Sequence, residues 1–268
     1  MASVTGRIKE VKQPWGGYIK PSSFEAIVVD DGFTLNSEEN IHGSNIGLTV
    51  DYLTRFIMTK KAKDAFNISL LGAQIAEQFG AIEDALEIAY RMLANIKELD
   101  NGSIINACRL VTFDAWYRNP MGAALAKMYY EIKPDKSTIE NIRIMVNRSI
   151  AFFDKYGPIV KEGFTFESAS GNKDDLGGYT ATVNTGDGDF ITADTLWDFK
   201  VSKSKPTNKH TLQLLMYWIM GKHSGQDIFK SITKLGIFNP RLNTIYTFEL
   251  SKVPDDVIKA VEKDVICY

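Results

Sequence analysis

The segment 186–200, GDGDFITADTLWDFK, constrains the fold more than any other part of the chain. It reads as two short strands joined by a tight turn, with large apolar residues between charged ones. Because side chains alternate between the two faces of a strand, Asp198 and Lys200 should point one way and Trp197 and Phe199 the other. The sequence therefore predicts a hairpin with one charged face and one face that belongs to a core.

The register of this hairpin decides its chemistry. A two-residue turn at Ala193 and Asp194 places Asp189 directly opposite Asp198, and like charges in that position destabilise a sheet. Two such carboxylates must share a proton, pair with a cation or bind a metal, and oxygen ligands suit Mg²⁺ or Mn²⁺. Lys200 would then lie beside the ion. A three-residue loop would shift the register by one residue.

Three short motifs stand in order along the chain: GxxD (Gly186 to Asp189), DxK (Asp198 to Lys200) and QxxxY (Gln213 to Tyr217). With a hairpin between the first two and a helix carrying the third, the set resembles the PD-(D/E)XK nuclease superfamily and, within it, the RecB-like branch. The resemblance covers about residues 178–221. It implies an α/β (α+β) fold, namely a restriction-endonuclease-like core with a mixed central sheet flanked by helices, preceded by a largely helical N-terminal half.

The same resemblance implies phosphodiester hydrolysis with Mg²⁺ or Mn²⁺ as the cofactor. Asp189, Asp198 and the backbone carbonyl of Phe199 would hold the ion. Lys200 would orient the attacking water or stabilise the charge of the transition state. Each role needs its residue type, since a hard cation requires carboxylates and a flexible ammonium suits a phosphate oxygen or a water.

Each part of this set also has a plain structural interpretation. Asp198 and Lys200, two apart on a strand, are often only a surface ion pair. Gln213 and Tyr217, four apart, fit one face of a half-exposed amphipathic helix, whereas the resemblance implies that they approach the nucleic-acid backbone or a metal-bound water. Asp189 favours the metal interpretation, because an ion pair needs no third charge on that face.

Many members of this superfamily supply a further acidic metal ligand from a helix upstream of the hairpin. The candidates here are Glu77, Glu83, Glu87 and Glu167. Glu77 is preferred because its helix, SLLGAQIAEQFG, is apolar and rich in small residues and could pack closely against the sheet. The alternative is a solvent-facing glutamate with no role.

Basic side chains gather in the segment 201–211, between the hairpin and the following helix: Lys203, Lys205, Lys209 and His210. Cations beside a metal site focus a polyanion there, so these residues are predicted to bind nucleic acid. A solvated loop is the alternative. Trp15, Trp116 and Trp218 are interpreted as core residues rather than as stacking platforms for unpaired bases.

Composition is that of an ordinary globular protein, with 268 residues, 44% hydrophobic and 24% charged. The formal net charge of −2 excludes a broad basic surface, so any contact with nucleic acid must be local. Cys108 and Cys267 lack partners at metal-binding spacing, which indicates reduced thiols and no zinc site. With no export signal and no long apolar run, we expect a cytoplasmic protein that does not contact membranes.

The pattern of the chain predicts a mainly helical region at residues 1–160, packed on a core at 161–268 that contains a β-meander, the QxxxY helix and a C-terminal strand and helix. One continuous domain is the alternative. The expected strands are 24–29, 178–184, 188–192, 195–201, 234–238 and 242–250. The expected helices are 47–61, 67–99 with a break near Gly80, 102–130, 137–156 with a capping box from Ser137 to Glu140, 211–221, and a short one after Pro254.

The sequence thus favours a metal-dependent nuclease acting on DNA, a RecB-like exonuclease or endonuclease from phage, mobile-element or defence biology. One alternative is a catalytically inactive module of the same fold that binds nucleic acid or a protein partner. Another is a small-molecule phosphodiesterase or nucleotide-processing enzyme. The helical half would supply selectivity, a protein partner's docking surface or a homo-oligomer interface.

Overall fold

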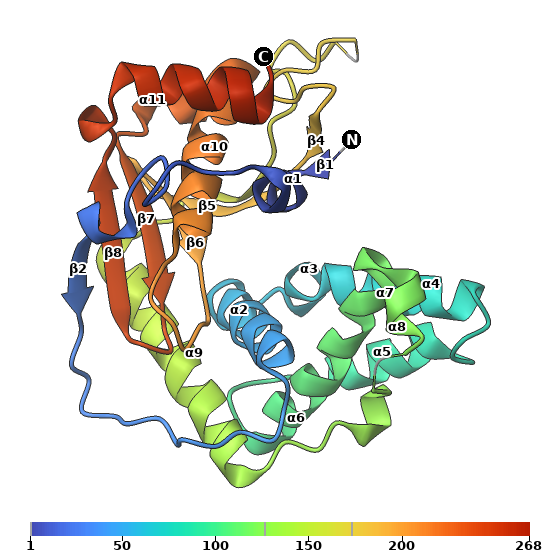
Figure 1. Ribbon diagram of the computed structural model, residues 1–268. Helices are drawn as coiled ribbons and strands as arrows, with labels where there is room; N and C mark the ends of the chain where they lie inside the picture. The colour runs from blue at the N-terminus through green and yellow to red at the C-terminus, as the bar shows by residue number, and fades with distance from the viewer. Residues whose placement is uncertain (1, 126, 173) are drawn as a thin grey trace. The chain divides into compact units, whose positions relative to one another are not determined.

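The computed structural model describes residues 2–125, 127–172 and 174–268. The chain forms two compact units (Figure 1). The sheet unit comprises Met1–Val29 and Phe152–Tyr268, and the helical unit comprises Asp30–Ala151. The N-terminal segment therefore belongs with the sheet, whereas the predicted division placed all of residues 1–160 in one region. The predicted mixed α/β class is confirmed.

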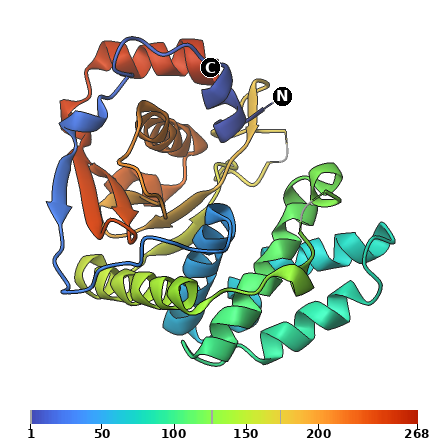
Figure 2. The same cartoon turned by 60° about the horizontal axis from the view of Figure 1, so that its bottom comes forward.

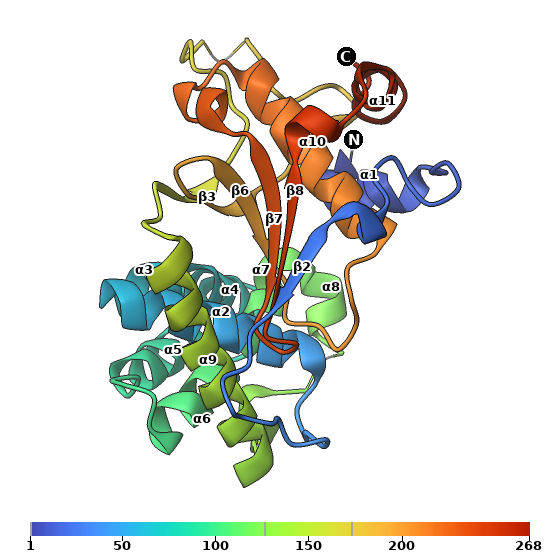
Figure 3. The same ribbon diagram turned by 90° about the vertical axis from the view of Figure 1, so that its left-hand side faces the viewer.

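The sheet unit is built around a six-stranded sheet with the strand order β2-β8-β7-β6-β5-β3, of which Figure 3 gives a side view. The strands are β2 (Glu25–Val28), β3 (Lys161–Phe164), β5 (Gly188–Ile191), β6 (Thr195–Phe199), β7 (Lys234–Asn239) and β8 (Thr244–Glu249). Only β6 and β7 are parallel, and the other neighbours are antiparallel. The sheet is therefore mixed, as predicted.

The predicted meander is wrong in its first strand. The segment 178–184 does not pair with β5. Its only strand, β4 (Val183–Thr185), pairs in parallel with β1 (Ala2–Ser3), and β5 pairs instead with β3. A turn redirects the chain here, because the Tyr179 hydroxyl donates a hydrogen bond to the Gly186 carbonyl at 2.8 Å and the Thr180 hydroxyl accepts one from the Val183 N–H at 3.0 Å.

Helix α9 (Lys136–Tyr156) covers one face of this sheet with its C-terminal end, after which the Gly157–Pro158 peptide is cis. The Phe152 ring stacks on Phe238 with a centroid distance of 4.2 Å and meets Trp197 edge-on at 4.9 Å. Phe153 packs against Phe190 at 4.7 Å. Aromatic side chains from three adjacent strands therefore form one buried cluster under the helix end.

Helix α10 (Asn208–Ser224) covers the opposite face and joins the parallel strands β6 and β7 (Figures 1 and 2). Its leucines pack with Leu196 and Ile237 of the sheet in the larger apolar core. Outside α10 lie α1 (Val4–Glu10), α11 (Asp255–Ala260) and the π-helix η6 (Val261–Ile266). The short 3₁₀ helices of this unit are η1 (Pro21–Ser23), η4 (Asp227–Ser231) and η5 (Leu250–Lys252). Because it is covered on several sides, α10 is buried along most of its circumference, and the half-exposed helix considered from sequence is wrong.

The helical unit contains α2 (Gly43–Thr59), α3 (Ala62–Ala65), α4 (Asn67–Gln78), α5 (Ala85–Ala94), α6 (Asn101–Leu110), η2 (Val111–Phe113), α7 (Asp114–Arg118), α8 (Pro120–Ala123), η3 (Tyr129–Glu131) and most of α9. The predicted break near Gly80 is confirmed, since α4 ends before it and α5 begins after it. The predicted helix over 102–130 is broken into α6, η2, α7, α8 and η3, and residue 126 lies outside the described residues.

Asp114 is buried and accepts hydrogen bonds from the hydroxyls of Tyr52 (2.6 Å) and Ser69 (2.5 Å). Burial raises the pKa of Asp114, and the two hydroxyls oppose that rise.

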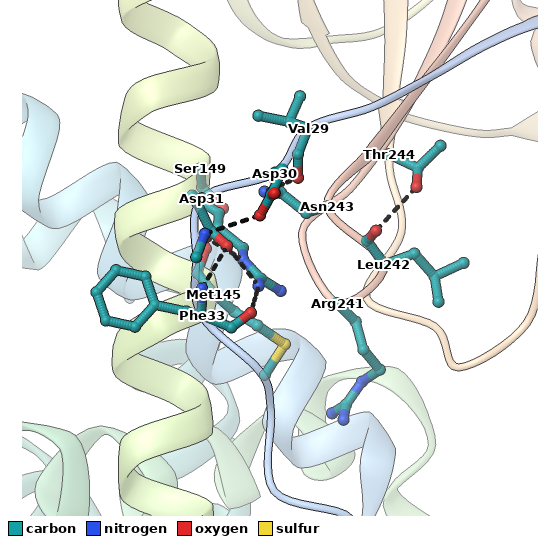
Figure 4. A network of polar contacts seen from close by, with 12 residues as sticks. Val29, Asp30, Asp31, Phe33, Met145, Ser149, Arg241, Leu242, Asn243 and Thr244 are labelled. Atoms are coloured by element: carbon teal, nitrogen blue, oxygen red, sulfur yellow. Dashed lines mark hydrogen bonds and ion pairs between the residues drawn. The ribbon is translucent and has the colours of Figure 1, made fainter.

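Two polar contacts fix the chain on either side of the point where it passes from one unit to the other (Figure 4). Within the sheet unit, the Asn243 side-chain amide donates to the Val29 carbonyl at 2.7 Å. Within the helical unit, the Arg148 guanidinium contacts Asp31 at 2.6 Å and the Phe33 carbonyl at 2.7 Å. This ion pair lowers the pKa of Asp31.

The capping box predicted at Ser137 to Glu140 is wrong by two residues. Helix α9 begins at Lys136, and the Thr138 N–H donates to the Asp135 carboxylate at 2.8 Å. Asp135 is therefore the capping residue, because its short carboxylate can reach the third N–H of the helix.

We expect Gly236→Ala to destabilise the sheet unit. A Cβ atom at Gly236 in β7 would lie 2.2 Å from Cε3 of the buried Trp197. The free energy of unfolding in urea should fall by about 1–3 kcal/mol, as for other overpacked cores. Gly43→Ala is the matched control, since a Cβ atom there has nothing within 4 Å. Equal stability of the two variants would contradict the packing described here.

Candidate active site

The hairpin of β5 and β6 has the predicted register. Phe190 pairs with Trp197 and Ile191 with Leu196, and the Thr192 N–H donates to the Thr195 carbonyl at 3.0 Å. The turn therefore consists of Ala193 and Asp194. Continuation of this register sets Asp189 opposite Asp198, on the sheet face that α10 covers.

The Asp189 carboxylate replaces a backbone carbonyl as the next hydrogen-bond acceptor between the two strands. Its Oδ2 accepts a hydrogen bond from the Phe199 N–H at 2.6 Å, and the backbone pairing of the two strands ends at Phe190 and Trp197. In an antiparallel ladder, the N–H and C=O of one residue point toward the same neighbouring strand. The Phe199 carbonyl therefore points toward the Asp189 strand, where the resemblance implies a metal ligand.

Asp198 is buried, with only 2% of its surface exposed. Lys200 Nζ lies 2.9 Å from each of its carboxylate oxygens, but only the contact to Oδ1 has hydrogen-bonding geometry. The buried Oδ2 has no hydrogen-bond partner among the described residues. A buried carboxylate oxygen without a hydrogen bond is costly, so this is a place where a further cation would be favourable. The simple surface ion pair considered from sequence does not describe a carboxylate this deeply buried.

Gln213 and Tyr217 reach the same place from α10. The Gln213 amide donates to the Tyr217 hydroxyl at 2.7 Å, and both side chains are buried. The pKa of Tyr217 is raised well above its usual value, first by burial and then by the nearby charges of Asp198 and Asp189. The structure thus brings together Asp189, Asp198, Lys200, Gln213 and Tyr217.

His210 stands at the start of α10 and faces the same charges. Burial lowers its pKa, and the neighbouring Lys200 lowers it further, while Asp198 opposes the shift. The Thr207 N–H donates to His210 Nδ1 at 3.2 Å. His210 is therefore a half-buried residue of the helix start, whereas Lys203 and Lys205 of the loop and Lys209 of α10 are exposed, and their role in binding nucleic acid stays a prediction.

Glu77 lies in the helical unit, exposed near the end of α4. Its carboxylate accepts a hydrogen bond from the Leu86 N–H at 2.9 Å and so holds the start of α5. Its role as a metal ligand stays a prediction. Asp187 was missed from sequence: its charge also contributes to the raised pKa of Tyr217. Its position two residues before Asp189 in the sequence was the available signal.

Within residues 2–125, 127–172 and 174–268, no group of three or more His, Cys, Asp or Glu side chains is arranged to hold a metal ion. The donor set at the hairpin is smaller: two opposed carboxylates and one backbone carbonyl. Oxygen donors of this kind suit Mg²⁺ or Mn²⁺ with several retained waters.

In comparisons with known proteins, no family model, no curated protein and no solved structure matches the chain. The helices in the described part of the chain are all too short or too polar to span a bilayer.

We expect the Tyr217 hydroxyl to make stability depend on alkaline pH. Because the pKa of Tyr217 is raised in the folded state, its stabilising contribution is complete below about pH 10 and declines above it. The difference in unfolding free energy between the native chain and Tyr217→Phe should be constant up to pH 10. Above it, the difference should shrink by about 1.4 kcal/mol per pH unit. Urea denaturation across this range measures it, and parallel curves at every pH would contradict a buried neutral phenol.

Proposed function

We propose that this protein is a metal-dependent nuclease with a PD-(D/E)XK, RecB-like active site that hydrolyses phosphodiester bonds of nucleic acid, with DNA as the favoured substrate. The observation that carries the proposal is the pair Asp189 and Asp198, opposed across a hairpin, with Lys200 2.9 Å from Asp198. The buried Asp198 oxygen that lacks a hydrogen bond supports a cation at this point.

The architecture of the sheet unit supports the same proposal. Along the chain, the end of α9, the strands β3, β5 and β6, helix α10 and strand β7 follow in that order, and the two helices cover opposite faces of the sheet. This arrangement is compatible with a restriction-endonuclease-like core. The site lies near the C-terminal end of β6, beside a parallel neighbour, where α/β sheets commonly bind ligands.

The residues present fit a divalent ion. Asp189, Asp198 and the Phe199 carbonyl would hold Mg²⁺ or Mn²⁺, and the bound ion would supply charge neutralisation and a water of lowered pKa. Lys200 is close enough to both Asp198 oxygens to hold that carboxylate in place. Its flexible ammonium can also donate to a phosphate oxygen when nucleic acid is bound.

The side chains of α10 would orient the reactants. The Gln213 amide fixes the position of the Tyr217 hydroxyl, which the raised pKa keeps protonated and able to donate a hydrogen bond. Lys203, Lys205 and Lys209 are exposed cations that would contact the phosphate backbone and set its position without reading sequence. His210 would face the same backbone from the start of the helix.

A catalytically inactive module of the same fold is the second candidate. It is favoured by the small donor set, because the described residues gather two carboxylates at the hairpin and no third ligand from a side chain. The two candidates differ in turnover and in metal binding, which can be measured separately.

We expect metal-dependent cleavage by the native chain and its loss on substitution at the hairpin. In a gel assay with linear and circular, single- and double-stranded DNA and RNA, Asp198→Ala and Lys200→Ala should each lower the rate by about 100-fold or more, because the first removes a ligand of the proposed ion and the second removes a cation at the reacting phosphate. Asp194→Ala is the matched control, since it removes a carboxylate from the turn of the same hairpin whose ion pair, to Lys234 of β7 at 3.1 Å, lies outside the site. No cutting of any polymer would favour the inactive module.

We expect Mg²⁺ or Mn²⁺ to raise the midpoint of thermal unfolding. A ligand that binds only the folded state stabilises it by about 2.7 kcal/mol at a concentration of 100 times its Kd. Asp198→Asn should abolish the shift, and Asp194→Asn should keep it. If the native chain and Asp198→Asn respond equally to the ions, the hairpin carboxylates are not the metal site.

A further inference from the structure

Among the described residues of the sheet unit, Trp15 is the most exposed large apolar side chain, with 92% of its surface accessible. The interpretation of Trp15 as a core residue is therefore wrong. Its indole ring stands in the loop between α1 and η1, and Lys20 Nζ lies over it at 5.4 Å from the ring centroid. An exposure this high means that the ring offers open aromatic surface to an incoming ligand.

The loop that carries Trp15 is anchored to the first turn of α10. The Gly17 N–H donates to the Pro14 carbonyl at 2.9 Å, and Gly17 has a φ of +91°. A Cβ atom at Gly17 would lie 2.6 Å from Cβ of Asn208, so only glycine permits this close approach. The buried hydroxyl of Thr211 donates to the Ile19 carbonyl at 2.7 Å. The chain that follows Trp15 is thus tied at two points, Gly17 and Ile19, to one helical turn.

That helical turn leads directly into the candidate active site. Thr211 precedes Gln213 by two residues, or roughly 3 Å of helix rise. Lys205 precedes this turn, Lys209 belongs to it, and Lys20 lies beside Trp15. Among the described residues these three lysines form no ion pair, so their charges remain available to an anionic ligand.

We infer that Trp15 is a stacking platform for an unpaired base, and that Lys20, Lys205 and Lys209 hold the phosphates on either side of it. The inference rests on the proposed function and narrows its substrate to single-stranded nucleic acid or to frayed duplex ends. Every base has a face that can stack on an indole, so binding would tolerate any sequence. A base inside a duplex is already stacked and cannot use the platform.

The test is the affinity of the full chain for labelled oligothymidylate and for a blunt-ended hairpin duplex, measured by fluorescence anisotropy in EDTA so that no cleavage occurs. Trp15→Ala should weaken binding of the single strand roughly 5- to 150-fold, the range for loss of one stacked base. Trp15→Phe should recover most of the affinity. Binding of the duplex should change less than about twofold, because its bases make no contact with the platform.

Tyr90→Ala is the matched control, because Tyr90 is an exposed aromatic residue with Lys63 Nζ at 5.9 Å from its ring centroid. It should leave both affinities unchanged. The inference is overturned if Trp15→Ala binds the single strand as tightly as the native chain, if single strand and duplex weaken equally, or if the native chain binds no single strand. A monomer produced by Trp15→Ala from a native dimer would also overturn it, since the ring would then contact a second copy.

Cleavage measured in parallel with Mg²⁺ separates this inference from the proposed function. Cutting of single strands that does not depend on Trp15 overturns the stacking platform and leaves the nuclease proposal in place. Binding that depends on Trp15 without any cutting supports the platform and overturns the nuclease proposal.

Discussion

The burial of one carboxylate, that of Asp198, is the constraint on which the arrangement of the sheet unit depends. Asp198 lies two residues after Leu196 on the same face of β6. That face is otherwise apolar and is covered by α10, so the carboxylate is a charge among apolar residues. The structure offsets the cost of burial only in part, through the ammonium of Lys200, and leaves one oxygen without a hydrogen bond. The strand must be held firmly for such a charge to stay buried, and the aromatic cluster under α9 holds it from the other face.

Much of this site could be predicted from sequence because a hairpin is local. Alternation along two short strands and the length of the turn determine that Asp189 faces Asp198, and neither depends on distant parts of the chain. The same reasoning predicted the wrong strand pairing for the segment 178–184. Whether a strand pairs with its neighbour in sequence or with β1, at the other end of the chain, is decided by packing that no local pattern records. The burial of α10 was missed for the same reason, since its cover comes from α1 and η6.

Residues outside the hairpin and α10 were the hardest to assign. Glu77 lies in an apolar helix, as expected from sequence, but its carboxylate accepts a hydrogen bond from the Leu86 N–H in the first turn of α5. Trp15 was expected in the core but is exposed. Tryptophan is usually buried, and only the close approach of Gly17 to Asn208 reveals that its loop is held on α10 with the ring outside. Composition predicts where a residue type is usually found, whereas its role depends on contacts between segments far apart in the chain.

Charge connects the two proposed steps, which are capture of nucleic acid at the Trp15 loop and its cleavage at the hairpin. A net charge of −2 and the paired carboxylates repel a phosphate backbone, so the backbone can reach the hairpin only when a cation neutralises Asp189 and Asp198. Stacking on Trp15 and contacts with Lys20, Lys205 and Lys209 would have no such requirement, because neither would involve the carboxylates. Nucleic acid would therefore be captured at the loop without metal, and would advance to the carboxylates only with it. Binding would then depend on the Trp15 loop, and turnover on the hairpin carboxylates with their cation. The two places are close because Thr211, which holds the loop, precedes Gln213 of the site by only two residues in α10.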